Sequence, residues 1–547
     1  MKGNKLILGC ALGNCVHIGG LNHFLSIAEE EGFRTYSLGP AVKVSRLVLE
    51  VEKLQPAIVA ISYRLTPSVA ETLFDELIKE VKKRSINNIK FIFGGTPSVA
   101  KVAGKKSFFE KVFDGTESID SIREYLRGTT GKDVSQTYPQ TLVERIRNRY
   151  PLPILRHHFG RPSLRETIEG VKKIAEAKVL DVISLGTDQN AQEFFFKPER
   201  MRKELDGAGG VPVRTPEDLK RIYEESRTGN FPLMRCYSGT NDLMKWAKMS
   251  IETINNAWAA IPLTWYSVMD KRSERLLKEA ISENQRVMKY YAERRIPVEV
   301  NESHQWSLRD AHDSLAVAMA YIAAYNAKKV GVKHYVSQYM FNTPPGTSPR
   351  MDLAKMKAKD EMINRLSSND FEVFREVRAG IAHFSPNPEI AKGQLAASAM
   401  VSLWLKPHIL HVVAYCEGDH AVYPEELIES CNIVYGVIKN VARDLPDIKD
   451  DKLIINRKNE LISEAETLIE AIVKLGDGRA EDPLTDAGVL ADAIKIGILD
   501  TPHFRGNEHL CGNIKTNLIN GAWYAIDPET GEILSEEKRL KQIIINK

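Results

Sequence analysis

The sequence contains few cysteines and no long apolar run. Six cysteines are spread over 547 residues, and no two of them form a C-x-x-C pair. Secreted disulfide frameworks and zinc ribbons need closely spaced cysteines, so we exclude both classes. No apolar stretch approaches the roughly 20 residues that a membrane-spanning helix needs. The apolar run near the amino terminus is brief and leads into a glycine-rich turn, so we expect a cytoplasmic protein with no membrane segment.

The chain also lacks an excess of charge of either sign. Its 75 basic and 72 acidic residues give a formal net charge of +3. A surface that binds nucleic acid would raise the positive charge well above this value, so we expect no nucleic-acid partner. Hydrophobic residues make up 43% and charged residues 27% of the chain, which is typical of a globular protein that buries a large core.

Strand and helix patterns alternate over residues 1–128. We expect strands at 5–10, 34–37, 57–62, 89–93 and 112–114, separated by helices at 20–31, 41–53, 66–83 and 118–126. This alternation predicts an α/β domain with a parallel sheet and helices on both faces, a flavodoxin-like (Rossmann-type) fold. Ligands of that fold bind beyond the carboxyl ends of the strands. The G-x-G-x-x-G fingerprint of a dinucleotide site is absent from the first turn.

A second series of strand and helix patterns follows residues 129–150, which we interpret as a linker because they include a Gly/Thr/Ser-rich stretch without periodicity. Over 151–445 we expect a (β/α)8 TIM-type barrel, since about eight βα units fit the size of that fold. The expected strands are 182–186, 210–213, 231–236, 261–266, 298–301, 333–339, 380–384 and 409–415. We expect residues 446–547 to form a helical and loop extension that packs on the barrel.

The turn after the first strand and the ends of two later strands carry a recognisable pattern. His17 precedes Gly20 by three residues, Ser62 ends the third expected strand, and Gly94 and Gly95 follow the fourth. The pattern resembles that of domains that bind cobalamin with its base displaced, which carry D-x-H-x-x-G, a serine and a glycine pair in this order. The resemblance implies that the histidine ligates the cobalt, and that the glycines and the serine line the slot for the nucleotide tail.

One position departs from that family. Cys15 stands where the family has an aspartate that holds the imidazole of the ligand through its other nitrogen. A carboxylate there fixes the tautomer and raises the basicity of the ligand, whereas a thiol is a weak substitute. We assign Cys15 to the cofactor site beside His17, and the sequence leaves open whether the base of cobalamin is displaced.

The second region resembles the large subunit of glutamate mutase (methylaspartate mutase), as the first resembles its small subunit. The likeness is clearest at the turn 238–242, at the loop 418–426 and in the tail around 487–502. It implies an adenosylcobalamin-dependent carbon-skeleton mutase, a radical isomerase in which both subunits are fused into one chain. It also implies a homodimer that forms through the barrel. The cofactor of such an enzyme supplies the radical, and the protein positions a small-molecule substrate.

Polar residues after the expected strands are the candidates for binding that substrate. Arginines of the family clamp substrate carboxylates with two parallel hydrogen bonds. The family's glutamate after the fourth strand is missing here, so we expect a small amino or carboxylic acid other than L-glutamate. The catalytic candidates are Arg214, Arg235, Tyr237, Glu302, His304 and Glu417. Asp419 is a candidate for the ribose hydroxyls of the adenosyl group.

Two other functions stay open. A corrinoid-dependent methyltransferase also combines a barrel with a cobalamin domain, although such domains usually follow a helical bundle and none precedes His17. A non-catalytic cobalamin-binding protein fits the altered pocket and the substitution at Cys15.

Histidines near the last strand raise the question of a metal site. His408 and His411 lie three residues apart on a strand, so their side chains point to opposite faces and do not readily share an ion with each other or with His420. Cys236, Cys416 and Cys431 are most simply interpreted as small buried residues. The metal that we predict is therefore the cobalt of cobalamin, on His17.

Overall fold

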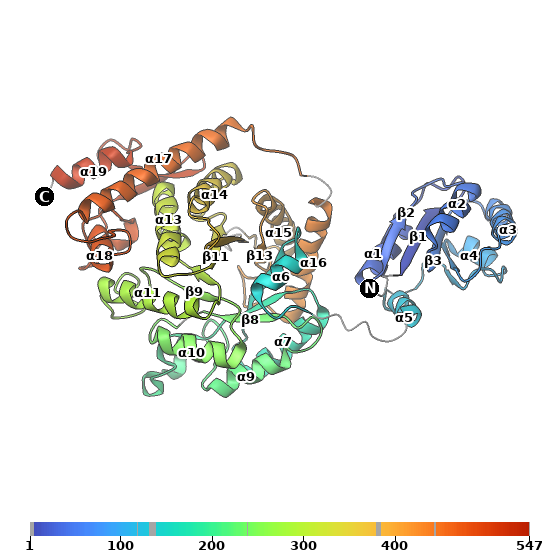
Figure 1. Ribbon diagram of the computed structural model, residues 1–547, viewed down its shortest axis with the longest axis horizontal. Coiled ribbons are helices and arrows are strands. Elements are labelled where there is room, and N and C mark those ends of the chain that lie inside the picture. Colours follow the sequence, from blue (N-terminus) through green and yellow to red (C-terminus); the bar gives the residue numbers. More distant parts are fainter. Residues whose placement is uncertain are drawn as a thin grey trace. The chain divides into compact units, whose positions relative to one another are not determined.

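The computed structural model describes residues 5–117, 119–130, 138–237, 239–378, 384–441 and 445–545 (Figure 1). Contacts divide the chain into two compact units, Met1–Gln136 and Thr137–Lys547. Each unit has hydrophobic clusters of its own. In the described ranges, every helix is too short or too polar to cross a bilayer.

The first unit is built on a five-stranded parallel sheet with the strand order β2-β1-β3-β4-β5. Its strands are β1 (Leu6–Ala11), β2 (Arg34–Ser37), β3 (Ile58–Tyr63), β4 (Lys90–Gly95) and β5 (Lys111–Phe113). Its helices are α1 (Gly19–Glu30), α2 (Val44–Leu54), α3 (Pro67–Lys83), α4 (Pro97–Ala103) and α5 (Ile119–Thr130). This strand order is that of flavodoxin-like folds, so the predicted fold class is confirmed.

Alternating side chains of the sheet feed two separate cores. Leu8, Val59 and Phe91 face α2, α3 and α4. Ile7 and Ile58, which precede Leu8 and Val59 in their strands, face α1 and α5. The strands β1, β3 and β4 are covered on both faces and are apolar at nearly every position, which is why their positions could be predicted, whereas β2 lies at the edge of the sheet and is largely exposed. The connections run to opposite sides from β1 and β3, so the crevice at the carboxyl ends of these two strands is the expected place for a ligand.

The second unit contains eight parallel strands in the order β8-β7-β6-β13-β12-β11-β10-β9. They are β6 (Ile154–Phe159), β7 (Val182–Leu185), β8 (Leu233–Cys236), β9 (Ala259–Ile261), β10 (Val298–Val300), β11 (His334–Met340), β12 (Glu372–Arg378) and β13 (Ile409–His411). Between the terminal strands of this order, the side chain of Asn256 accepts a hydrogen bond from the backbone N–H of Cys236 (3.2 Å), and Ala257 N–H donates to the carbonyl of Met234 (2.8 Å). The sheet thereby forms a nearly closed barrel, and the predicted TIM-type fold is confirmed.

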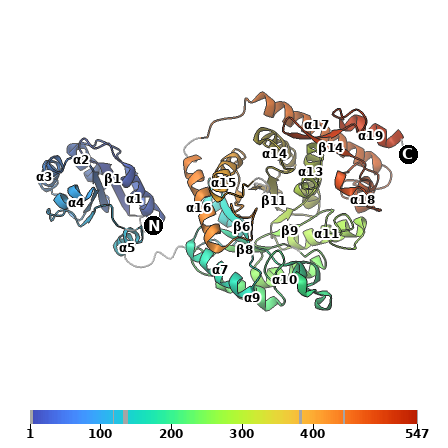
Figure 2. The ribbon, with the colours of Figure 1, turned by 180° about the vertical axis from the view of Figure 1, so that it is seen from behind.

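Helices surround this ring of strands, as Figures 1 and 2 show from opposite sides. They are α6 (Leu142–Arg149), α7 (Leu164–Ala177), α8 (Gln189–Phe194), α9 (Pro216–Glu225), α10 (Leu243–Ile254), α11 (Leu277–Glu293), α12 (Ser303–Ser307), α13 (Asp313–Lys329), α14 (Pro349–Asn364), α15 (Pro388–Leu403) and α16 (Pro424–Val441). Residues 129–150, expected as a linker, hold the end of α5 and all of α6, and the boundary between the two units falls among them.

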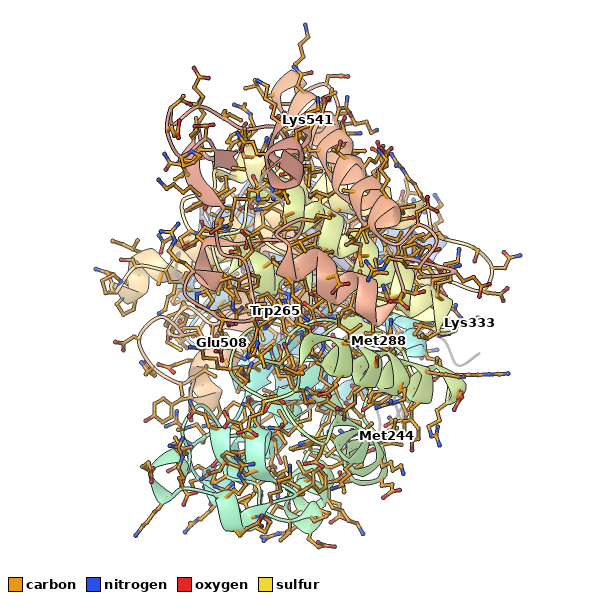
Figure 3. The ribbon with its side chains drawn as sticks, turned by 90° about the vertical axis from the view of Figure 1, so that its left-hand side faces the viewer. Met244, Trp265, Met288, Lys333, Glu508 and Lys541 are labelled. Carbon is orange, nitrogen blue, oxygen red and sulfur yellow. The ribbon has the colours of Figure 1, made fainter. Side chains whose placement is uncertain are left out.

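The carboxyl-terminal extension consists of α17 (Lys452–Leu475), α18 (Ala487–Lys495), the antiparallel pair β14 (Lys515–Ile519) and β15 (Ala522–Ile526), and α19 (Glu536–Ile545). It shares a hydrophobic cluster with α11, α13 and α14 of the barrel. Trp265, labelled in Figure 3, contacts the rings of Trp306 and Phe504 at centroid distances of 5.2 and 5.9 Å. Aromatic contacts of this kind fasten the extension to the loops that follow β9 and β10.

Four barrel strands differ from the sequence prediction. The fourth strand, β9, ends at Ile261, where the expected strand 261–266 begins. The segment 210–213 is not a strand, because Val211 makes only an isolated bridge to Thr187. Of the predicted strand 380–384, residues 380–383 lie outside the described residues, and the seventh strand is β12. The first strand, β6, was missed because its sequence ILRHHF places charged and imidazole side chains where an apolar run is expected.

The amino-terminal end of the barrel is closed by an apolar floor. The floor consists of strand residues that point inward together with the inner face of α6, namely Ile154, Val182, Leu233, Trp258, Val336, Phe374, Ile409, Leu142 and Ile146. Because α6 directly precedes β6, this short helix is in position to cover the bottom of the ring. Everything polar inside the barrel therefore lies above this floor, toward the carboxyl ends of the strands, where barrel enzymes have their active sites.

Leu142 is 1% exposed and packs into this floor, so we expect Leu142→Ala to lower the free energy of unfolding of the second unit by about 2–5 kcal/mol. All six tryptophans lie in this unit, so tryptophan fluorescence during urea unfolding measures its stability alone. Leu453→Ala, at a leucine that is 55% exposed, is the control. Equal losses in the two variants would contradict the role assigned to α6.

Candidate functional site

The turn after β1 presents His17 at the surface and anchors it from below. Cys15 is fully buried, and its Sγ lies 4.0 Å from Nδ1 of His17. The thiol therefore lies beside Nδ1 of the ring, and Nε2 makes no hydrogen bond to a described residue. The hydroxyl of Tyr63, itself buried, donates to Oδ1 of Asn14 (3.1 Å) and ties the turn to the end of β3.

The sheet brings the other predicted residues of this site to the same edge. Ser62 pairs with Ala11 of β1 on one side and with Gly94 of β4 on the other. A Cβ at Gly94 would meet no atom within 4 Å, and the same holds at Gly20. Open space thus lies over both glycines, at the carboxyl ends of the strands.

Gly95 has a different reason to be glycine. A Cβ there would lie 2.5 Å from the carbonyl oxygen of Tyr63 and 2.8 Å from the ring of Phe93. The two glycines therefore have different roles. Gly95 permits the close packing of β3 and β4, while Gly94 leaves room for a ligand.

Inside the barrel, a layer of charged side chains lies directly above the apolar floor. Arg156 donates from Nε to Oε1 of Glu376 (2.8 Å), and Nη2 of Arg235 lies 3.2 Å from Oε2 of Glu299. These four side chains are completely buried. Removing an ion pair from water costs several kcal/mol per ion, so such a layer persists only where each charge has a partner.

Neutral hydrogen-bonding groups and aromatic rings complete this ionic layer. Ser184 accepts from Nη1 of Arg156 (3.3 Å), and the indole N–H of Trp258 donates to Glu299 (2.7 Å). Arg235 is held between the rings of Tyr237 and Trp258, at 4.7 and 4.8 Å from their centroids. Several atoms remain without a hydrogen-bond partner in the described part of the chain, namely Nε and Nη2 of Arg235, Oε1 of Glu299 and Oε2 of Glu376.

Histidines form the next layer, toward the mouth of the barrel. Nε2 of His158 lies 2.8 Å from Nη1 of Arg156, which can only donate, so this nitrogen is an acceptor and the ring is neutral, and the hydroxyl of Tyr237 lies 2.9 Å from the same nitrogen. Burial, followed by the charge of Arg156, holds the pKa of His158 well below its usual value. The same two causes, with Arg378, lower the pKa of His411.

Arg378 is a further cation of this mouth. It follows Glu376 by two residues on β12, so its side chain points to the same face of the strand. Its charge lowers the pKa of His158, His304 and His411 after burial has done so, which places it among them. It has no ion pair with a carboxylate among the described residues, and its buried Nε has no hydrogen-bond partner there. An anion is the ligand that such a group favours.

The predicted catalytic residues fall into two groups. Arg235, Tyr237 and His304 lie in or beside the polar interior of the barrel, because each is in contact with, or electrically coupled to, the residues described above. Glu302 is also buried, but it accepts hydrogen bonds from the backbone of Leu263 (2.8 Å) and Thr264 (3.1 Å), and so holds the loop after β9.

The remaining predicted residues lie outside that interior. Arg214 makes a two-pronged ion pair with Asp188, at 3.0 and 2.6 Å, and so stabilises the loop between β7 and α9. Oε1 of Glu417 lies 2.8 Å from Nε2 of His157, and Asp419 is 80% exposed and bound to His420.

Sequence reasoning missed most of the charged interior. Arg156, His158, Glu299, Glu376 and Arg378 were not selected, although each stands in a β-strand of the barrel. A charged residue flanked by apolar ones in a strand of a parallel sheet is a signal that would have identified Glu299, which lies between Val298 and Val300, since both faces of such a strand are buried.

Comparison with known proteins gives no family for this chain. No family model matches it. No curated protein matches it either.

Solved structures give weak likenesses. A novel cobalamin-binding protein from Desulfitobacterium hafniense DCB-2 is 26% identical over 23% of this chain and 58% of its own length, with a TM-score of 0.20. The apo cobalamin-dependent S-adenosylmethionine radical enzyme OxsB is 10% identical over 87% of this chain and 75% of its own, also with a TM-score of 0.20. A Rubisco-like protein from Rhodopseudomonas palustris is 8% identical over 56% of this chain and 70% of its own, with a TM-score of 0.32. Similarities of this size assign no function.

The neutral state of His411 leads to a prediction on pH. The folded protein holds the pKa of His411 well below 6.5, while the unfolded chain takes up a proton near that pH, so the wild type loses stability as the pH falls. His411→Gln removes this effect. We expect the wild-type free energy of unfolding, relative to that of the variant, to be constant above about pH 7 and to fall by up to about 1.4 kcal/mol per unit below about pH 6. A difference that does not change with pH would show that the ring is equally protonated in both states.

Proposed function

We propose that this chain is an adenosylcobalamin-dependent isomerase of the carbon-skeleton mutase type, acting on a small amino or carboxylic acid. The observation that carries the proposal is the placement of His17. Its imidazole stands exposed at the carboxyl end of β1, with Nδ1 on a buried thiol and Nε2 without a partner among the described residues. A ring held by one nitrogen with the other free is the arrangement of a metal-binding histidine.

The surroundings of His17 fit the cofactor. Ser62 and Gly94 lie side by side on the neighbouring strands, and the space above Gly94 is open. A dinucleotide would need a G-x-G-x-x-G turn, which this turn lacks. In this proposal Nε2 of His17 is the lower ligand of the cobalt, Cys15 orients the ring, and Gly20, Ser62 and Gly94 line the slot of the nucleotide tail.

The interior of the barrel supports a small anionic substrate. Arg378 supplies a positive charge that pairs with no carboxylate of the described residues, and the neutral rings of His158 and His411 supply hydrogen-bonding groups that bring no charge of their own. We propose that Arg378 binds a carboxylate of the substrate, and that Tyr237 and His158, which already share a hydrogen bond, orient it. Arg235 lies between two aromatic rings and is paired with Glu299, so its guanidinium is held in one position below this site.

The division of labour follows from the cofactor. Adenosylcobalamin supplies a carbon-centred radical when its cobalt–carbon bond breaks, so the protein needs no strong acid or nucleophile. Its residues bind and orient the substrate and exclude water, which the buried ionic layer and the apolar floor achieve. The resemblance to glutamate mutase, stated above, is also the basis of our proposal that the chain forms a homodimer through its barrel.

The cobalamin site can be tested by titrating the purified full-length protein with adenosylcobalamin under anaerobic conditions. We expect binding to produce the spectrum of cobalamin with its base displaced, and His17→Ala to abolish that spectrum. Gly94→Ala places a methyl group in the open slot and should weaken binding about tenfold or more, or about 1.4 kcal/mol. His23→Ala, at an exposed histidine of α1, is the control. No uptake of cobalamin by the wild type would refute the proposal, and uptake of methylcobalamin with methyl transfer would favour the methyltransferase.

The anion site can be tested with a panel of small amino and dicarboxylic acids, by their protection of the protein against thermal unfolding. A hydrogen bond to a charged group contributes about 1.5–3 kcal/mol, so Arg378→Gln should weaken binding of a protecting acid about tenfold or more. Arg375→Gln is the matched control, because that arginine lies on the same strand but bonds to the carbonyl of Lys406 on the outside. Identical binding by the two variants would contradict the role of Arg378.

A further inference from the structure

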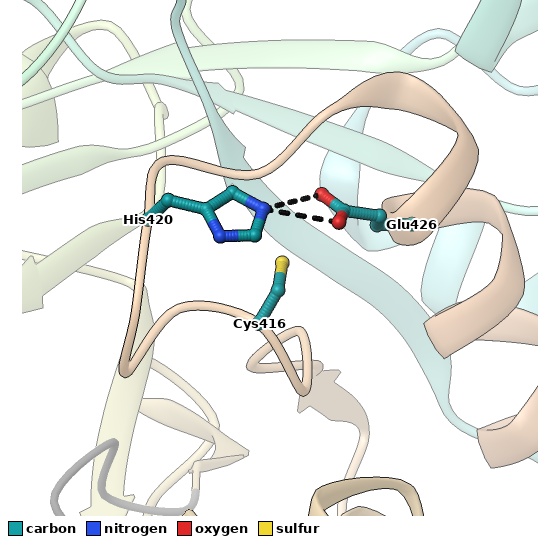
Figure 4. A group of neighbouring side chains, drawn as sticks. All are labelled: Cys416, His420 and Glu426. Atoms are coloured by element: carbon teal, nitrogen blue, oxygen red, sulfur yellow. Dashed lines mark hydrogen bonds and ion pairs between the residues drawn. The ribbon is translucent and has the colours of Figure 1, made fainter. Parts of the chain in front are cut away.

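The loop between β13 and α16 gathers three metal-ligating side chains. The Sγ atom of Cys416, a ring nitrogen of His420 and a carboxylate oxygen of Glu426 all lie within 4.8 Å of one another (Figure 4). The backbone N–H of His420 donates to the carbonyl of Cys416 (3.0 Å), and this turn places the two side chains on the same side. Glu426 comes from the first turn of α16, so the group joins the end of a barrel strand to the start of a helix.

The imidazole of His420 is already oriented as a ligand. Its Nδ1 lies 2.7 Å from Oδ2 of Asp419, and its Nε2 points at Glu426, 3.0 and 3.1 Å from the two carboxylate oxygens. Metal-binding histidines nearly always have a carboxylate or carbonyl on the second ring nitrogen, which fixes the tautomer. Asp419 has that place here.

The loop is held in shape by contacts of Arg161 and by a hydrogen bond to one of the two carboxylate oxygens of Glu426. The guanidinium of Arg161 stacks on the ring of Tyr423 at 3.7 Å from its centroid, and its Nη1 donates to the carbonyl of Ala421 (2.5 Å). The N–H of Tyr423 donates to Oε2 of Glu426 (2.9 Å), which leaves Oε1 as the oxygen that is not used to cap α16. The three donor atoms are thus positioned without an ion.

The donor set selects the metal. A thiolate, an imidazole and a carboxylate are the ligands that zinc prefers, with bonds of about 2.0–2.3 Å, which place donors about 3–4 Å apart. An inward movement of the side chains by a fraction of an ångström brings the present separations into that range. Cys416 is only 6% exposed, while the side chain of His420 is 38% exposed, so the group is closed on one side and open to water on the other.

We propose that Cys416, His420 and Glu426 bind one Zn²⁺ ion, with water as the fourth ligand and Asp419 as the residue that positions His420. Three protein ligands and one open position are the arrangement of a zinc ion that acts on a bound molecule. Binding converts the thiol of Cys416 to the thiolate and removes the proton that Nε2 of His420 directs at Glu426, and both protons pass to the solvent. The site lies wholly within the second unit and is independent of cobalamin.

The test uses the full-length protein, freed of metal with a chelator and kept without cobalamin. We expect elemental analysis after dialysis against zinc to give one equivalent per chain. Substitution with Co²⁺ should give the near-ultraviolet charge-transfer absorption of a thiolate–cobalt bond. Cys416→Ser should abolish that absorption, and Cys511→Ser, at a cysteine remote in sequence and only partly buried, should leave it intact.

Asp419→Asn keeps the test sensitive if a buried substitution disturbs the fold. Asp419 is 80% exposed, so its replacement leaves the structure unchanged, yet loss of such an orienting carboxylate weakens metal binding about 10–100-fold. Zinc binding below one equivalent, or equal in the wild type, Cys416→Ser and Asp419→Asn, would overturn the proposal and leave His420 and Glu426 as an ion pair at a helix terminus. Because cobalamin is absent throughout, this result is separate from the outcome for His17.

Discussion

The interior of the barrel depends on one constraint, the pairing of Arg156 with Glu376 and of Arg235 with Glu299 in a fully buried layer. An uncompensated charge at this depth would cost about 3–5 kcal/mol, the penalty of breaking a buried ion pair. Each member therefore fixes the position of its partner across the ring, between strands that are far apart in the sequence. The paired charges separate two parts of the barrel interior. Apolar residues fill the floor below them, and polar residues line the mouth above them.

The two arginines also determine the chemistry of the mouth. Burial, followed by the positive charges of Arg156 and Arg378, lowers the pKa of both His158 and His411, and Arg235 contributes to the shift of His158. A neutral imidazole has one nitrogen that donates a hydrogen bond and one that accepts, and it brings no charge of its own to the mouth. Glu299 responds in the opposite direction, because burial, and then the nearby charge of Glu376, raise its pKa against the pull of Arg235. The mouth thus favours an anionic ligand, and Arg378 is the residue that we expect to bind it.

The fold could be predicted from the sequence to the extent that buried strands are apolar. The strands β1, β3 and β4 of the first unit follow this rule, and so does β7 in the second. The rule fails at β6 because Arg156 and His158 point into the barrel, where a partner from β12 makes their burial possible. The sequence near Arg156 does not indicate its partner Glu376, which lies 220 residues away along the chain.

The sites divide along the same line. His17, Gly20, Ser62 and Gly94 could be selected in advance because they belong to one turn and to strand ends of fixed spacing, and the structure brings them to one edge of a sheet. Arg214 and Glu302 stand at equally plausible places in the sequence, yet their hydrogen-bonding capacity is used by loops next to them. Cys416, His420 and Glu426 lie within ten residues of each other along the chain, but only the turn at Cys416 shows that their side chains converge.

The central claim is that the imidazole of His17 ligates the cobalt of cobalamin. Electron paramagnetic resonance of the reduced Co(II) form, bound to protein labelled with ¹⁵N only in histidine, tests it most directly. The axial nitrogen splits each cobalt line, into three for ¹⁴N and into two for ¹⁵N. The account predicts the two-line pattern in labelled protein and the three-line pattern in unlabelled protein. Three lines in both would show that the ligand is the cofactor's own base, and would contradict the role given to His17.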